Sequence, residues 1–187
     1  MIVLKECCKY FHKGSVNEVF ALNRISLDIH TGDFITVIGS NGAGKSTLLN
    51  AIAGSFFLDS GQIFVGDQAV TDWPEHKRAS LISRVFQDPL LGTCPSATIE
   101  QNMALAQKRG ERRGFSRGVK VSDRKDFCDR LKMLGLGLEN RLQDRVGLLS
   151  GGQRQALTML MATMVRPRVL LLDEHIAALD PKTAGQI

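Results

Sequence analysis

The sequence predicts an α/β fold with a mostly parallel sheet and an inserted helical segment. Two apolar runs of strand length, residues 34–39 and 168–174, are followed by glycine-rich or polar residues. Between these runs, residues 88–148 carry apolar side chains at helical rather than strand spacing. Strands that alternate with helices along the chain build mostly parallel sheets, and this order gives the fold class.

The first elements follow from hydrophobic periodicity. Residues 20–29 alternate between apolar and polar side chains, as a half-buried strand does. The turn TGD then leads into residues 34–39, a continuous apolar run typical of a buried parallel strand. Residues 45–54 have apolar side chains at helical spacing, and we expect that helix to end at Gly54.

The next segments complete the pattern. Residues 61–70 are predicted to form a strand with turns at Gly61 and Gly66, and residues 81–87 form another strand. Helices are expected over residues 96–107, 123–137 and 150–165, before the strand at 168–174.

Composition and charge restrict the class of protein. The 187 residues are 43% hydrophobic, and the formal net charge is +5. The positive charge is concentrated in residues 108–125, which contain eight Lys and Arg but only two acidic residues. Because the rest of the chain is nearly neutral, we expect no nucleic-acid partner. The basic segment is either a solvated loop or a contact for anionic headgroups or a partner protein.

The chain shows no sign of secretion or of a membrane span. Its four cysteines lack metal-ligand spacing and are expected to be reduced thiols of a cytosolic protein. The N-terminus has no signal-peptide pattern, and no window reaches eighteen apolar residues. Membrane association would then require a partner.

The segment GSNGAGKS, residues 39–46, fits the pattern G-x-x-x-x-G-K-[ST] and lies between a predicted strand and a predicted helix. Glycines let successive backbone N–H groups point inward, and a helix N-terminus adds partial positive charge. A glycine-rich turn without function is the alternative. We predict that phosphate is bound by Gly39, Ser40, Asn41, Gly42, Ala43, Gly44, Lys45, Ser46 and Thr47, with Lys45 on the β and γ phosphates and Ser46 on Mg²⁺.

The apolar run at 168–174 ends in two carboxylates. Ligands of open α/β sheets bind at the carboxyl ends of strands, so Asp173 is predicted to hold Mg²⁺ and Glu174 to polarise the water that attacks the γ-phosphate. A strand followed by a polar turn is the simpler alternative.

A second anion-receiving helix start is predicted at LLSGGQ, residues 148–153. Ser150 is a good N-cap, and Gly151 and Gly152 permit close backbone approach. Because this segment has no lysine of its own, we expect it to close on a nucleotide held by another copy. A helix simply started by Ser and Gly is the alternative.

Together and in this order, the three stretches resemble the ATP-binding cassette family, the nucleotide-binding subunits of ABC transporters, over essentially the whole chain. The resemblance implies a P-loop NTPase fold with an N-terminal antiparallel β subdomain. It further implies a nucleotide-binding core of residues 1–87 and 149–187 and an inserted helical subdomain of residues 88–148.

The resemblance also assigns roles to further residues. Phe11, or Tyr10, stacks on adenine, and Gln87 lies near Mg²⁺ and the attacking water. Asp180 belongs to the loop that communicates across a head-to-tail dimer. In that dimer ATP is contacted from the second copy by Ser150, Gly151, Gly152 and Gln153.

The sequence departs from the family pattern near its end. His175 and Ile176 follow Glu174 where many members have Pro and Thr, and we expect His175 to be a neighbour in the turn rather than catalytic. The family's functional histidine and a further strand lie beyond the given residues, so the resemblance implies that a C-terminal part is missing.

The function implied is ATP binding and hydrolysis that power import of a small solute, with ATP and Mg²⁺ as cofactors. The expected partners are separate permease subunits, a second cassette and, indirectly, a solute-binding protein, on the cytoplasmic side of the membrane. Residues 135–163 and 170–184 look like the cassettes of amino-acid uptake systems of the tryptophan or tyrosine type. The alternatives are a nucleotide-binding fragment with little turnover and a non-transport ATPase acting on nucleic acid or ribosomes.

Overall fold

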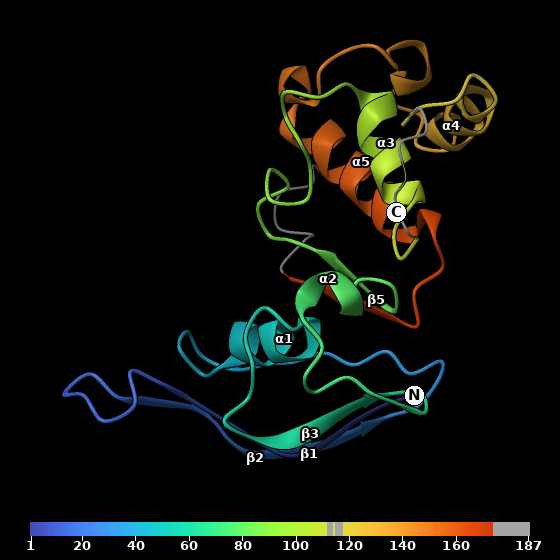
Figure 1. Cartoon of the computed structure of the whole chain (residues 1–187). Helices are drawn as coiled ribbons and strands as arrows, with labels where there is room; N and C mark the ends of the chain where they lie inside the picture. Colours follow the sequence, from blue (N-terminus) through green and yellow to red (C-terminus); the bar gives the residue numbers. More distant parts are fainter. Residues whose placement is uncertain (112–113, 115–117, 174–187) are drawn as a thin grey trace. The chain divides into compact units, whose positions relative to one another are not determined.

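The computed structural model of the chain describes residues 1–111, 114 and 118–173 (Figure 1). These residues form two compact units, an N-terminal unit of residues 1–82 and a C-terminal unit whose described part begins at residue 83 and ends at residue 173. The α/β class and the antiparallel N-terminal β subdomain are both confirmed.

A four-stranded sheet with the order β2-β1-β3-β4 forms the N-terminal unit, and all of its neighbouring strands are antiparallel. The predicted half-buried strand at 20–29 is confirmed as β2, in which Leu22 is buried. The strands are β1 (Ile2–Phe11), β2 (Val19–Ile29), β3 (Ser60–Val65) and β4 (Gln68–Ala69).

The turn predicted at Gly61 is wrong, although the turn at Gly66 is confirmed. Gly61 lies inside β3 with φ 98°, and a Cβ there would be 2.5 Å from the Glu6 carbonyl oxygen and 2.6 Å from Cys7 Cα. The register of β1 shifts opposite this position, between Lys5 and Cys8. Glycine is therefore required by the close approach of a bulged neighbouring strand rather than by a turn.

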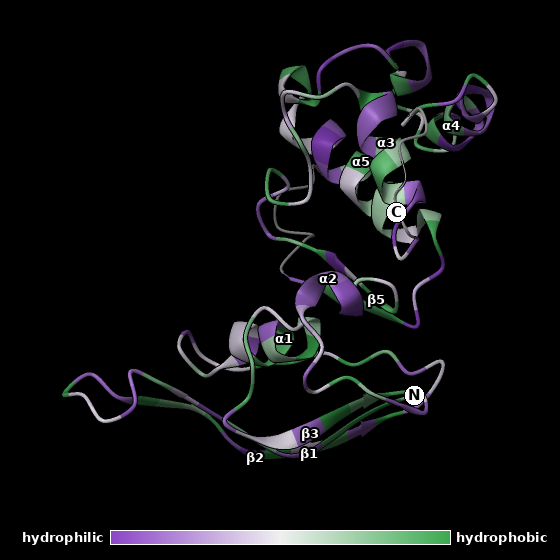
Figure 2. Cartoon of the chain, in the orientation of Figure 1, coloured by the Kyte–Doolittle hydropathy of each residue, from purple (hydrophilic) through white to green (hydrophobic). Residues whose placement is uncertain are grey.

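Helix α1 (Lys45–Ala53) lies over one face of the sheet (Figure 1) and buries Ala51, Ile52 and Ala53. It ends at Gly54, φ 85°, as expected for a left-handed C-terminal residue. The short helix α2 (Glu75–Arg78) is hydrophilic throughout (Figure 2).

Arg78, the last residue of α2, is nevertheless buried, with 1% exposure. Its guanidinium donates hydrogen bonds to the carbonyls of Ala51 (2.7 Å) and Ile52 (3.0 Å) in the last turn of α1. It also donates to Trp73 (3.0 Å) and Thr71 (2.8 Å), so one side chain ties the end of α1 to the chain before α2.

The prediction of a buried strand at residues 34–39 is wrong. These residues belong to no strand, and Phe34 and Ile38 are 86% and 89% exposed. A buried parallel strand exists only with hydrogen-bonded neighbours, and no strand in the described ranges pairs with this segment.

The C-terminal unit combines a two-stranded sheet of β5 and β6 with three helices. Each of these elements was expected from its periodicity. Their bounds are β5 (Ile82–Val85), β6 (Val169–Leu172), α3 (Ile99–Gln107), α4 (Asp123–Lys132) and α5 (Gly151–Met164), with 3-10 turns at η1 (Leu138–Asn140) and η2 (Val146–Leu148).

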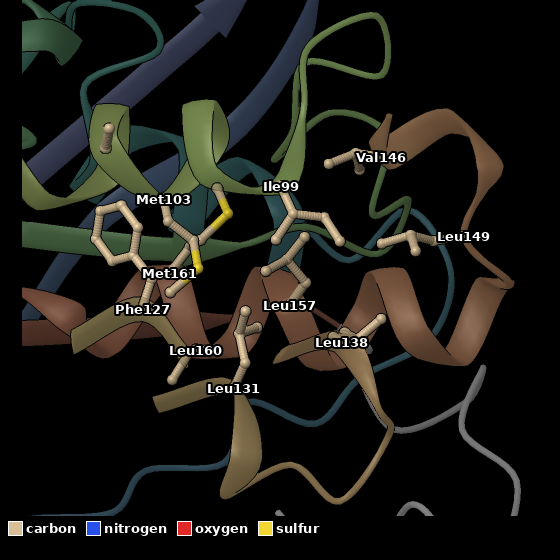
Figure 3. Close-up of a cluster of buried hydrophobic side chains, with 11 residues drawn as sticks. Ile99, Met103, Phe127, Leu131, Leu138, Val146, Leu149, Leu157, Leu160 and Met161 are labelled. Carbon is tan, nitrogen blue, oxygen red and sulfur yellow. The ribbon is translucent and has the colours of Figure 1, made fainter. Parts of the chain in front are cut away.

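The three helices share one hydrophobic core (Figure 3). Leu157 and Met161 of α5 pack with Met103 of α3 and Phe127 of α4 in this cluster. The core thus joins α5 to the helices of residues 88–148, and the division at 148/149 stays a prediction.

Backbone hydrogen bonds join the segment before α3 to the segment before α5. The Gly147 and Val146 amides donate to the carbonyls of Pro95 (2.9 Å) and Ala97 (3.0 Å), and the Ile99 amide donates to the Asp144 carbonyl (3.0 Å). We call residues 95–100 with 142–147 the loop ladder.

Part of the basic segment is structural. Arg109 donates to the carbonyls of Ala162 (3.1 Å) and Val165 (2.6 Å) at the end of α5, and Arg124 pairs with the buried Glu100 (2.8 Å). Residues 112–113 and 115–117 lie outside the described residues. Within the described part of the chain, no helix is both long and apolar enough to cross a bilayer.

Candidate nucleotide-binding site

The glycine-rich loop reaches α1 through two glycines with positive φ. Gly42 has φ 83°, and Gly44, the N-cap of α1, has φ 88°. No side chain caps this helix. The backbone amides in the first turn of α1, including those of Ser46 and Thr47, can therefore bind an anion, as the amides at a helix N-terminus do.

Gly44 is fixed by its contact with β2. A Cβ at this position would lie 2.9 Å from the Ala21 carbonyl oxygen and 4.0 Å from Leu22 Cδ2. At Gly42, which has nearly the same φ, a Cβ would meet nothing within 4 Å. The loop is thus close to the backbone of β2 at Gly44, whereas the space beside Gly42 is open.

Lys45 is held by the loop that it follows. Its ammonium donates to the carbonyls of Gly39 (2.7 Å) and Ser40 (2.9 Å). The Ala43 amide donates to the same Ser40 carbonyl (3.2 Å), which closes the loop on itself. A positive charge is therefore held against the backbone of this loop, where it can attract a phosphate group.

Two aromatic residues at the end of β1 belong to the same unit as this loop. Tyr10 stacks on Phe20 with ring centroids 4.1 Å apart, and Phe11 meets Phe56 edge to face at 5.4 Å. Lys9 lies 5.7 Å from the Phe11 ring centroid. Phe11 as the adenine-stacking residue remains a prediction.

In the C-terminal unit, Asp173 and Gln87 follow neighbouring strands. The Asp173 amide donates to the Val85 carbonyl (3.1 Å), so Asp173 continues the pairing of β6 with β5. Gln87 lies two residues beyond β5 and is exposed. The pattern of apolar strand followed by polar residue therefore brings both to one region of this unit.

Asp173 also has a partner that the sequence did not reveal. Arg84 Nη2 lies 3.0 Å from Asp173 Oδ2, and the guanidinium carbon lies 4.6 Å from the centroid of the Phe86 ring. The two charged residues are 89 positions apart in the chain. Only strand pairing brings them together, so no local pattern signals this contact.

The predicted N-cap at Ser150 is confirmed, and it is part of a capping box. Ser150 Oγ accepts from the Gln153 amide (3.3 Å), and Gln153 Oε1 accepts from the Ser150 amide (3.2 Å). A Cβ on Gly151 or Gly152 would meet nothing within 4 Å. The start of α5 is thus ordered by two side chains and open at its two glycines.

Arg154 supports this helix start and was also missed from the sequence. Its guanidinium donates to the carbonyls of Val146 (3.4 Å), Gly147 (3.3 Å) and Leu149 (3.0 Å). It thereby fixes the turn that precedes Ser150. Glu174 and Asp180, predicted as the water-polarising base and the dimer-loop residue, lie outside the described residues.

Comparison with known families decides the identity of the chain, because residues 22–177 match the family "ABC transporter". The chain belongs to the ABC transporter family. Within it, the chain is 43% identical to the tyrosine transport ATP-binding protein of Clostridioides difficile (strain R20291), over all of this chain and 74% of that protein. It is 38% identical to the sulfoquinovosyl glycerol transport ATP-binding protein of Agrobacterium fabrum (strain C58), over 87% of this chain and 42% of that protein.

Solved cassettes share the fold of this ABC protein. One is a dimeric ATP-binding cassette in a post-hydrolysis state bound to ADP and Pi, with a TM-score of 0.84 and 29% identity over all of this chain and 79% of that one. Another is a nucleotide-free cassette from an ABC transporter, with a TM-score of 0.77 and 25% identity over all of this chain and 73% of that one. The P-loop NTPase fold is therefore confirmed, and the chain is a nucleotide-binding ATPase subunit of the ABC type.

Proposed function

We propose that this ABC subunit powers import of a small solute, in the first place an amino acid, through separate permease subunits. The cargo class is supported by the likeness to a protein named for tyrosine transport. A periplasmic or lipoprotein solute-binding protein would deliver the cargo, and the subunit would work on the cytoplasmic side of the membrane.

The observation that carries the mechanism is the second anion-receiving helix start at α5. The phosphate loop has Lys45 over its backbone, whereas Ser150–Gln153 present a capped helix end without a lysine. A cassette with two such sites is best used by two copies arranged head to tail, each closing its α5 end on the nucleotide in the other's loop. ATP would join the copies, and hydrolysis would release them.

The residues available for Mg²⁺ fit that ion. Ser46 supplies a hydroxyl, Gln87 an amide oxygen and Asp173 a carboxylate, and Mg²⁺ prefers oxygen donors with one or two carboxylates plus phosphates. Among the described residues, no group of three or more His, Cys, Asp or Glu could hold a metal. When bound, Mg²⁺ would neutralise the charge that develops on the transferred phosphoryl group.

The protein's own residues would do the rest. Lys45 would bind the β and γ phosphates, and the α1 amides would orient them for in-line attack. Glu174 would accept the proton of the attacking water, and Gln87 would orient that water. Phe11 would stack on adenine.

Equilibrium binding of ATP and its hydrolysis test this assignment. Lys45→Ala should abolish ATP binding, whereas Lys132→Ala, which removes an exposed lysine paired with Asp129 at 3.2 Å, should leave it unchanged. Glu174→Gln should bind ATP normally, lose hydrolysis and accumulate an ATP-held dimer. Hydrolysis at the parent rate by the Glu174 variant would show that another group is the base.

Transport is tested with the membrane partners. The subunit should copurify with its permease subunits, and the transported amino acid, presented with its binding protein, should stimulate ATPase activity in the reconstituted complex. Stimulation by DNA or ribosomes instead would refute the proposed transport role.

A further inference from the structure

Arg84 has no role in the function proposed above, yet it is bound to the residue proposed to hold the metal. Its Nη2 atom lies 3.0 Å from Asp173 Oδ2, and the two side chains are only 12% and 20% exposed. The pair lies across β5 and β6, where the Asp173 amide also donates to the Val85 carbonyl. Both the backbone and the carboxylate of Asp173 are therefore attached to β5.

The positive charge of Arg84 is held in place from a second side. Its guanidinium carbon lies 4.6 Å from the centroid of the Phe86 ring, within the range of a cation–π contact. A guanidinium that stacks on a ring and bonds a carboxylate is a rigid, permanently charged group. Solvent screening is also reduced, because both members of the pair are mostly buried.

A cation bonded to a carboxylate competes with any second cation for the same negative charge. If Asp173 binds Mg²⁺ through its carboxylate, the ion and the Arg84 guanidinium become neighbours on one group. Repulsion between a unit charge and a divalent ion at such separation weakens ion binding by about tenfold even in a water-like dielectric.

We propose that Arg84 sets the Mg²⁺ affinity of the site, by sharing the Asp173 carboxylate with the ion. Without metal, Arg84 neutralises Asp173 and keeps its carboxylate attached to β5. With nucleotide present, Mg²⁺ binds against this competition, so that its retention depends on the phosphates as well as on Asp173. This inference rests on the proposed role of Asp173.

Two ATP dissociation constants, one in EDTA and one in saturating Mg²⁺, test the inference without any measurement of turnover. Their ratio reports the Mg²⁺ affinity of the ATP-bound protein, because Mg²⁺ binding to free ATP is the same for every variant. Arg84→Gln removes the charge and should enlarge this ratio about tenfold. Arg84→Lys keeps a charge and should leave the ratio within about threefold of the parent value.

Arg130→Gln is the matched control, since Arg130 also pairs with an aspartate, Asp126 at 2.8 Å, but on the exposed surface of α4. Its ratio should equal that of the parent. Should Arg84→Gln fail to fold by circular dichroism, Arg84→Met repeats the test without burying an amide.

An unchanged or smaller ratio for the neutral Arg84 variants would overturn the inference, because Arg84 would then be a passive or supportive partner of Asp173. Failure of the proposed function gives a different result, namely that the parent protein binds ATP equally well with and without Mg²⁺, or does not bind it.

Discussion

Replacing Gly44 by alanine tests whether the phosphate loop is held by its contact with β2. Gly42 and Gly44 have nearly the same φ, 83° and 88°, but only at Gly44 does an added Cβ meet backbone, 2.9 Å from the Ala21 carbonyl oxygen. Gly42→Ala is therefore a matched control that carries the dihedral cost without the collision.

The expected losses in the free energy of unfolding follow from two costs, that of the left-handed backbone conformation and that of the contact between the added Cβ and the backbone. A left-handed conformation costs an alanine roughly 1–2 kcal/mol, of which about 0.4–1 kcal/mol is recovered because the unfolded chain becomes stiffer. Gly42→Ala should thus lower the free energy of unfolding by about 1 kcal/mol. Overpacking against backbone adds about 2 kcal/mol, so Gly44→Ala should lower it by about 3 kcal/mol.

Urea unfolding followed by tryptophan fluorescence measures the difference. Trp73 is the single tryptophan, and it lies in the same unit as the loop. With a typical slope, the midpoints of the two variants should differ by about 1 M urea, and Gly44→Ala should also bind ATP more weakly. If the midpoints coincide, the loop moves off Ala21 without cost and the reasoning is wrong.

Three further outcomes are expected. Arg78→Met should lower the urea midpoint of the N-terminal unit by about 1 M, since four carbonyls, two of them in buried hydrogen bonds, lose a donor. Arg24→Met, at an arginine with a side chain 78% exposed, should not lower it. A hydrogen bond with Ser96 lowers the pKa of the Cys94 thiol, which is also exposed, so mass spectrometry should find Cys94 alkylated first among the four cysteines. Burial, the largest single effect, would raise the pKa of Glu100, but the hydrogen bonds from Arg124 and Gln143 together with the charge of Arg124 outweigh it and lower that pKa. Stability from these contacts should be present at neutral pH and lost on acidification through the folded-state pKa, and Arg124→Met should reduce this acid dependence in unfolding experiments.

Helices and half-buried strands were predictable because their patterns are local. The period of apolar residues identified β2 and α5, and the N-cap preference of serine placed the start of α5 at Ser150. Gly54 ended α1 for the same kind of reason, since a left-handed residue is needed there whatever surrounds the helix.

The errors concern features that depend on distant neighbours. Gly61 was assigned to a turn because sequence shows only that glycine suits a positive φ, and the close approach of β1 cannot be read from it. The apolar run at 34–39 was assigned to a buried strand, but burial depends on neighbouring strands rather than on the run itself.

The candidate site divides in the same way. The order of residues in the phosphate loop specifies its glycines and Lys45, because the chemistry is built from consecutive backbone groups. The role of Arg84 was not predicted because its partner, Asp173, directly follows a different strand, β6, far away in the sequence. Arg154 was missed because an arginine in the first turns of a helix is most often solvated.

The backbone hydrogen bonds of the loop ladder join two segments of the C-terminal unit, so we expect the two segments to move together. The chain that follows Gln87 cannot shift at Pro95 or Ala97 without stretching the hydrogen bonds from Gly147 and Val146. Those two residues lie immediately ahead of Ser150, and Arg154 fastens the same turn to α5. A displacement of residues 95–97 would therefore reach the start of α5 as strain in main-chain hydrogen bonds and in the contacts of Arg154.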